Sequence, residues 1–313
     1  MKPLRSARRI SAALLAAFLC VAHAMAADAP ATPAAPKPPV PLLWKVSDAD
    51  NSVYLLGSFH LLKTDDYPLP KETQAAFADS ESLLFELSPD ALTAPDVAGK
   101  FATAAGYADG RNLQQVLPAA TYAALDKLAA SSGGVAGAMQ AQEPWFITLA
   151  ISIGIAQRLG FRPELGLDQH LMQRAAEANK PTAGLETIDA QLAALDSTPM
   201  QEQVAGLKEF VDDPKKSVAD MMELHRQWRA GDVAGLNRTM REEMIAKTPQ
   251  TYRLIDVARN EAWLPKIEAR LSGSKSGDTL VVVGALHLLG PDGLVEKLRA
   301  KGYKVERICS TCK

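Results

Sequence analysis

The most apolar strand candidate of the chain reads Thr279-Leu280-Val281-Val282-Val283-Gly284, and Ala285-Leu286-His287-Leu288 follows it directly. A short β-branched run that ends at glycine is typical of a strand buried in a parallel sheet. A second segment near the other end of the chain repeats the pattern, where Val53-Tyr54-Leu55-Leu56 leads into Gly57-Ser58-Phe59-His60. Both segments end in Gly-x-x-His. They predict two strands of one sheet, each with a histidine just beyond its carboxyl end.

Further strands are predicted on both sides of a helical middle. Residues 42–47 would form a hairpin with the strand that starts at residue 52, and strands are also expected at 82–87, 182–186 and 303–308. Helical spacing covers 71–79, 145–159, 168–178 and 293–301, most of 91–139, and the interrupted stretch 199–272. We expect one α/β (α+β) domain whose central sheet is built from both ends of the chain, with a long helical insertion between them.

The first 26 residues have the pattern of a secretory signal peptide. A basic start without acidic residues precedes an apolar run at 10–22, and Ala24-Met25-Ala26 supplies a small-x-small cleavage site. Residues 27–41 are rich in proline and alanine, which favours an extended linker, and the domain would cover 42–313. We therefore expect a periplasmic or secreted protein whose mature chain begins at Ala27.

The composition argues against two classes of protein. A formal net charge of −2 without a clustered basic face argues against a nucleic-acid partner. The longest internal apolar run, residues 145–156, is shorter than the about 20 residues of a spanning helix, so no stable membrane insertion is expected. Hydrophobic residues make up 47% of the chain and charged residues 22%, which is typical of a globular protein. The oligomeric state stays open.

Cys309 and Cys312 are the cysteines that remain once the signal peptide is removed. A single C-x-x-C pair supplies too few ligands for a structural zinc site, which usually takes four. In an oxidising compartment, a short terminal disulfide is the prediction.

The candidate chemistry lies at strand ends. Ligands bind at the carboxyl ends of strands in open α/β sheets, so His60 and His287 would converge if their strands are neighbours. Glu86 lies in the apolar run 82–87, and a buried carboxylate needs a partner or a metal ion. Two histidines and one carboxylate form a common metal-binding set with open coordination positions. The alternative for Glu86 is a strand-end salt bridge with Arg259.

Other polar residues have either functional or structural interpretations. Glu186 ends a predicted strand and is a candidate site residue, against a pairing role at a strand end. Arg259, one turn before Trp263, could be a stacked or salt-bridged surface arginine. Asp168 is expected to cap a helix. His170 and His225 are expected on helix surfaces.

The sequence resembles the TraB/PrgY/GumN family, whose animal members are the Tiki proteases that cleave Wnt proteins. The likeness spans nearly the whole mature chain and rests on the following segments: Leu43-Trp44-Lys45-Val46, Tyr54–His60, Asp66-Tyr67-Pro68-Leu69-Pro70, Glu86, Gly184-Leu185-Glu186-Thr187, Gln191, Arg259-Asn260 and Val283–Leu288.

This resemblance implies a metal-dependent peptidase in a fold similar to erythromycin-esterase-like proteins. It implies manganese or cobalt, with zinc also possible, at a centre that maps onto His60, His287 and Glu86, with Arg259 as the family's arginine.

The sequence therefore predicts an exported metal-dependent hydrolase of peptide or protein substrates. His60 and His287 would hold the metal, with Glu86 as third ligand or as base, and Arg259 would stabilise the developing oxyanion. The alternative is a non-catalytic periplasmic protein that binds a peptide or inhibits signalling through the same pocket. Aromatic residues, at 6% of the chain, are scarce for such a pocket.

Overall fold

The computed structural model describes residues 37–131, 134–272 and 277–312 of the chain. The predicted signal peptide and residues 27–36 of the predicted linker lie outside the described residues. The strands in the described part are β1 (Leu43–Ser47), β2 (Ser52–Ser58), β3 (Ser82–Phe85), β4 (Thr182–Gly184), β5 (Thr279–Gly284) and β6 (Lys304–Arg307).

These strands form one mixed sheet in the order β4-β3-β5-β2-β1-β6. β1 and β2 form the predicted antiparallel hairpin, with Leu43 opposite Leu56, and β6 pairs antiparallel with β1. β5 lies between β2 and β3, parallel to both, with Val282 opposite Leu56 and Phe85. The expectation that the two Gly-x-x-His strands are neighbours is confirmed, as is a sheet drawn from both ends of the chain.

The helices of the described residues are mostly in the middle of the chain. They are α1 (Lys71–Asp79), α2 (Pro89–Thr93), α3 (Val97–Ala104), α4 (Leu113–Val116), α5 (Ala119–Ala130), α6 (Pro144–Arg158), α7 (Leu167–Glu177), α8 (Ile188–Asp196), α9 (Met200–Asp212), α10 (Pro214–Ala230), α11 (Val233–Leu236), α12 (Glu243–Lys247), α13 (Pro249–Tyr252), α14 (Ala258–Leu271) and α15 (Leu294–Ala300). Two π-helical turns, η4 (Asn237–Glu242) and η5 (Arg253–Val257), interrupt the last part of this stretch.

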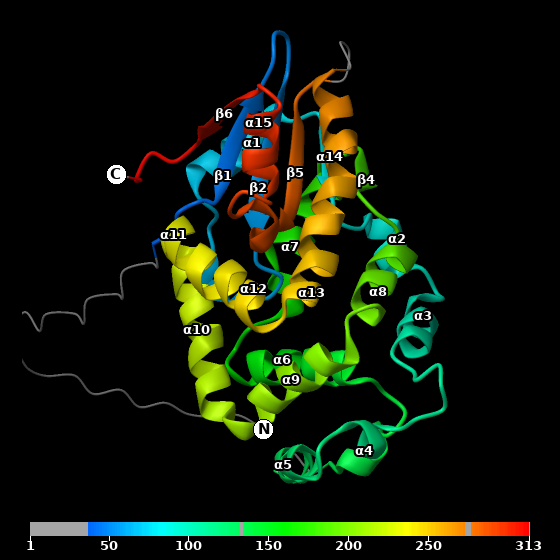
Figure 1. Cartoon of the computed structure of the whole chain (residues 1–313). Coiled ribbons are helices and arrows are strands. Elements are labelled where there is room, and N and C mark those ends of the chain that lie inside the picture. Colours follow the sequence, from blue (N-terminus) through cyan, green and yellow to red (C-terminus); the bar gives the residue numbers. More distant parts are fainter. Residues whose placement is uncertain (1–36, 132–133, 273–276, 313) are drawn as a thin grey trace, which may run out of the picture. The chain divides into compact units, whose positions relative to one another are not determined.

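The sheet is covered on both faces (Figure 1). α14 and α15 lie in front of the strands and α7 lies behind them. The central strands β2 and β5 are buried almost along their whole length, because apolar side chains from both layers pack against them. A smaller apolar cluster joins α5, α6 and α9 away from the sheet. The helical insertion therefore has a core of its own and approaches the sheet at the carboxyl ends of its parallel strands.

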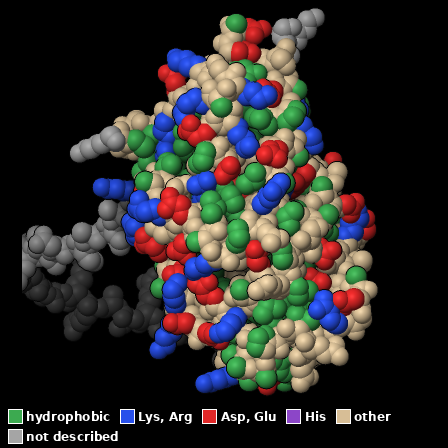
Figure 2. Space-filling model, viewed as in Figure 1, with side chains coloured by type: hydrophobic (Ala, Val, Ile, Leu, Met, Phe, Trp, Pro, Cys, Tyr) green, Lys and Arg blue, Asp and Glu red, His purple; other side chains and the backbone are tan. Residues whose placement is uncertain are grey.

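The surface carries charges of both signs. On the face in Figure 2, basic and acidic side chains alternate without a large area of one sign. No helix in the described part of the chain combines the length and the apolarity needed to cross a bilayer.

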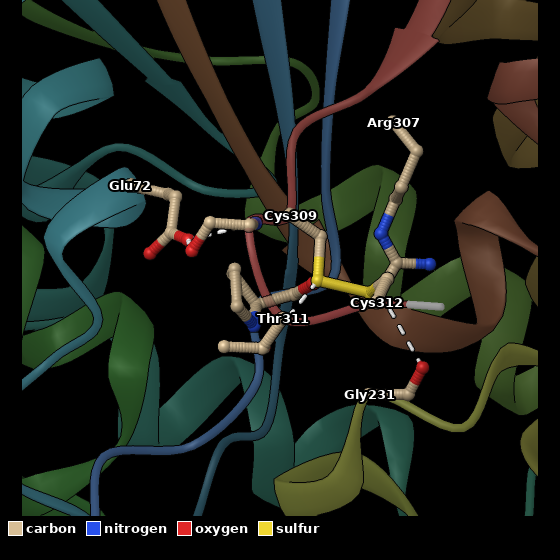
Figure 3. The surroundings of a disulfide bond; sticks show 8 residues. Glu72, Gly231, Arg307, Cys309, Thr311 and Cys312 are labelled. Carbon is tan, nitrogen blue, oxygen red and sulfur yellow. Dashed lines mark hydrogen bonds between the residues drawn. A yellow bond between two sulfur atoms is a disulfide. The ribbon is translucent and has the colours of Figure 1, made fainter.

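The predicted disulfide is present beyond β6. Cys309 and Cys312 are joined by an S–S bond of 2.09 Å (Figure 3). Between them, the backbone N–H of Ser310 donates to Oε1 of Glu72 on α1, at 2.9 Å. This contact ties the end of the chain to the body of the domain.

Candidate metal and catalytic site

The parallel strands bring the predicted site residues to one edge of the sheet. His60 follows β2, Glu86 follows β3, and His287 lies in the short 3-10 turn after β5. Glu186 follows β4, and its backbone N–H donates to the carbonyl of Glu86 at 3.0 Å. The carboxyl ends of neighbouring parallel strands meet in this way because the strands run in the same direction.

Glu86 lies in the middle of the group. Its side chain is only 13% exposed, Oε1 accepts the N–H of Gly284 at 2.7 Å, and Oε2 accepts a hydrogen bond from Nη2 of Arg259 at 2.7 Å. Burial alone would raise the pKa of Glu86, but the electrostatic interactions with His287, Arg259 and His60 outweigh it and lower the pKa to about 2. The carboxylate is therefore ionised at neutral pH and can accept hydrogen bonds or ligate a cation.

His60 is the accessible member, with a side chain that is 59% exposed. Its Nδ1 lies 3.1 Å from Oδ1 of Asp168, which also accepts a hydrogen bond from the hydroxyl of Ser58 at 2.8 Å. The charge of Asp168 raises the pKa of His60. With Nδ1 held by an acceptor, Nε2 is the atom left for the site. The contact of Nδ1 with Asp168 therefore fixes the orientation of the ring.

The prediction that Asp168 caps a helix is wrong. α7 begins at Leu167 with Gly166 as its N-cap, and Asp168 is already inside the first turn. Its carboxylate contacts Ser58 and His60 at the end of β2. A carboxylate on the far nitrogen of a metal-ligating histidine is a common arrangement, because it fixes both the tautomer and the ring orientation.

His287 is held in the same manner from another direction. Its Nδ1 lies 2.8 Å from Oδ1 of Asn260 and 3.0 Å from Oδ1 of Asp256, and its ring stacks at 4.5 Å on Trp263. Its Nε2 lies 3.2 Å from Nη1 of Arg259, an arginine that can only donate, so Nε2 carries the lone pair. Nε2 is also 3.8 Å from Oε1 of Glu86.

Gly284 lies where these groups converge. A β-carbon at this position would lie 3.2 Å from Oε1 of Glu86, 3.4 Å from Nε2 of His60 and 3.6 Å from Cδ2 of His287. The missing side chain of the first residue in the second Gly-x-x-His motif thus leaves the space that the two imidazoles and the carboxylate face. This accounts for the glycine in physical terms.

Arg259 joins the two carboxylates of the site. Beyond its bonds to Glu86 and His287, its Nε and Nη2 donate to Glu186, at 3.1 and 2.6 Å to Oε1. Glu186 also accepts Nε1–H of Trp263 at 3.2 Å. Burial would lower the pKa of Arg259, but the charges of Glu86 and Glu186 raise it. Arg259 is therefore salt-bridged and stacked on Trp263, as the alternative expected, but with 13% of its side chain exposed it does not lie on the surface.

The donors are of a kind that divalent cations bind, but they do not form a complete coordination site. Within 37–131, 134–272 and 277–312, no group of three or more His, Cys, Asp and Glu side chains is placed to hold a metal ion as it stands. Arg259 already donates to Nε2 of His287 and to Glu86. Beneath His287, the fully buried Asp256 has Oδ1 3.0 Å from Nδ1 of His287, while its Oδ2 lacks a hydrogen-bond partner among the described residues. Such an acid favours added positive charge nearby, so the residues fit the ion.

Two other histidines lie outside this group. The prediction that His225 is a surface residue is wrong: it is buried, and its Nε2 lies 2.9 Å from Oδ2 of the buried Asp66. His170 is half-buried and packs on Tyr67 with ring centroids 4.6 Å apart. Neither contacts Glu86.

The chain belongs to the TraB/PrgY/gumN family, whose model matches residues 42–307. The uncharacterized protein YbaP of Escherichia coli is 27% identical over 251 residues, which cover 79% of this chain and 87% of YbaP. The metalloprotease TIKI1 of Danio rerio is 23% identical over 84% of this chain and 62% of its own length. The human metalloprotease TIKI1 is 22% identical over 84% of this chain and 61% of its own length.

No solved structure matches the chain. The family membership predicted from the sequence resemblance is confirmed. The chain spans about three-fifths of the length of the TIKI1 proteins.

Proposed function

We propose that this protein is an exported, metal-dependent peptidase whose metal is held by His60, His287 and Glu86. The observation that carries the proposal is the matched orientation of the two histidines. Each Nδ1 is engaged by an acceptor from another element, Asp168 or Asn260, so that Nε2 of His60 faces Gly284 and Nε2 of His287 lies 3.8 Å from Oε1 of Glu86. The similarity to proteins named metalloproteases supports the same chemistry.

The residues divide the work of peptide hydrolysis. A divalent cation at this place would polarise the scissile carbonyl and lower the pKa of a water molecule. Arg259 stands beside the same centre as a fixed donor and would stabilise negative charge on the carbonyl oxygen in the transition state. Metal binding would replace the contact between Arg259 and Nε2 of His287. Glu186 contributes by holding Arg259, so we assign it a positioning role.

Glu86 has two possible roles that a single substitution separates. Glu86→Gln keeps the size of the side chain and removes its charge. If Glu86 is a metal ligand, Glu86→Gln should remove much of the metal affinity. If Glu86 is the general base, Glu86→Gln should leave the metal bound and slow hydrolysis by about 10²–10⁴-fold. Metal content and peptide cleavage measured on the same sample distinguish the two.

Metal analysis of protein purified without chelator tests the proposal. Wild-type protein should carry a divalent ion, with manganese, cobalt and zinc as the candidates, and His60→Ala should carry much less. His170→Ala is the matched control, because that half-buried histidine lines a different pocket from Glu86. Equal metal content in all three proteins would overturn the proposed centre.

Export is part of the same proposal. The basic start, apolar run and Ala24-Met25-Ala26 support cleavage after Ala26 and a periplasmic or secreted location. Amino-terminal sequencing of the mature protein should find Ala27, and an intact Met1 would contradict it.

A peptide-binding protein without activity is the alternative, and one observation favours it. Arg259 already donates to Glu86, Glu186 and Nε2 of His287 in the arrangement seen, so these groups have hydrogen-bond partners without an ion. Tight peptide binding by wild-type protein without metal and without cleavage would establish this alternative.

A further inference from the structure

We infer that the substrate is an extended polypeptide with a large apolar side chain next to the bond that is cut, and that a cavity bounded by Met240, Ile255 and Leu286 receives this side chain. The inference rests on the proposed peptidase function and adds its substrate preference.

The first support is the composition of the cavity wall. The cavity measures about 310 Å³ and is lined in part by His60, Glu86, Arg259 and His287. The other large side chains in its lining are apolar and half-buried, and they are Phe59, Leu61, Met240, Ile255 and Leu286. Apolar surface left partly open beside reactive groups is typical of a ligand pocket.

The second support is where two of these side chains come from. Met240 lies in the π-helical turn η4, and Ile255 lies in the π-helical turn η5. π-Helical turns are rare and are frequent at functional sites, because the extra residue re-aims the side chains that follow. η5 also supplies Asp256 beneath His287, and its Ile255 carbonyl accepts Nη1 of Arg259 at 3.0 Å. The same irregular turn thus forms the cavity wall and holds the catalytic arginine.

The third support is a second cavity beyond the reactive groups. It measures about 210 Å³ and shares only His60 and Glu86 with the first. Its wall comes from other elements, with Gln169 and Met172 of α7 and Gln191 of α8. Space on two sides of His60 and Glu86 suits a chain that continues past the cleaved bond in both directions. A small substrate would need only one of the cavities.

Charged side chains fit the first cavity poorly. Among the described residues that line it, the charged or titratable ones are Glu86, Arg259 and the two histidines. Each of these four has a partner within the site. A lysine or aspartate placed against the apolar wall would lose its hydration without gaining a partner. Leucine, methionine or phenylalanine would bury apolar surface there instead.

Cleavage of alanine-rich peptides with one varied residue tests the inference. Wild-type protein should cut beside leucine or phenylalanine at least about tenfold more efficiently, in kcat/KM, than beside aspartate or alanine. Met240→Ala should enlarge the cavity and shift the preference towards bulkier side chains. Met222→Ala is the matched control, because Met222 is an exposed methionine outside both cavities. Met240→Phe, which narrows the cavity, should favour smaller side chains.

Binding of the same peptides, followed by fluorescence anisotropy, separates the two proposals. Cleavage without any side-chain preference would overturn the apolar cavity and leave the peptidase intact. Selective binding of the leucine peptide that changes with Met240→Ala, but without cleavage, would support the cavity and overturn the peptidase. Absence of both cleavage and selective binding would overturn both.

Discussion

At the scale of single residues, Gly284 decides how closely the reactive groups can approach. Its torsions, φ −51° and ψ 140°, are accessible to alanine, so Gly284→Ala should fold. The added methyl group would lie 3.2 Å from Oε1 of Glu86 and push the carboxylate or His60 aside. We expect cleavage to fall by about tenfold or more, because small misplacements of reactive groups are costly.

Gly154→Ala is the control for this prediction. Gly154 lies inside α6 with nothing within 4 Å of an added β-carbon. Its replacement should raise the free energy of unfolding by about 0.5–1 kcal/mol and leave cleavage unchanged. Unimpaired cleavage by Gly284→Ala would contradict the crowded geometry.

Asp168 is the residue on which the orientation of His60 depends. Asp168→Ala should weaken manganese binding by about 10–100-fold, as loss of such partners commonly does. Asp168→Asn keeps an acceptor oxygen and should lose less of the manganese affinity. Titration calorimetry measures both, with Asp189→Ala as control, since Asp189 pairs with Lys100 on the surface. Wild-type affinity in Asp168→Ala would show that His60 needs no support.

At the scale of elements, a buried ion cluster joins α10 to the segment after β2. Asp66 is fully buried, contacts His225, and pairs with Arg229, which also donates to the carbonyl of Asp65 at 2.7 Å. Burial would raise the pKa of Asp66, but the hydrogen bonds from His225, the Lys63 N–H and Arg229 lower it below 3.8. Stabilisation from this group is therefore complete above that value and is lost as pH falls through the folded pKa.

Asp66→Asn should lower the free energy of unfolding at neutral pH by about 1.5–3 kcal/mol, the range for hydrogen bonds to charged groups. The difference from wild type should shrink as the pH falls below about 4. Urea unfolding at several pH values measures this difference. Asp65→Asn is the control, because Asp65 is the adjacent residue and is exposed. A difference that does not change with pH would contradict the ionised cluster.

The terminal disulfide should matter little to global stability. Chain-entropy stabilisation grows with loop length, and Cys309 and Cys312 are only three positions apart. Replacing both by serine should move the melting temperature slightly, because the Ser310 contact with Glu72 remains. Loss of folding in a calorimetric scan would show a larger role.

At the scale of the whole molecule, local sequence patterns are sufficient to predict the strands of the sheet. β5 and α1 have the predicted bounds, because an apolar run and a helical period are properties of neighbouring residues. The convergence of His60 and His287 also followed, since both continue parallel strands. The supporting role of Asp168 could not be predicted, because Asp168 is 108 positions away from His60 and its own segment carries no signal of the contact. His225 was misjudged for the same reason, since its partner Asp66 lies 159 positions away.

For the protein as a whole, we propose that His60 and His287 act as one unit on one ion. Cleavage of a peptide library with added manganese or cobalt tests this most directly, in wild type, His60→Ala, His287→Ala and the double variant. Each single variant should lose cleavage, and the double variant should be no worse, because residues that act together are non-additive. Full metal-dependent cleavage by either single variant would contradict the account.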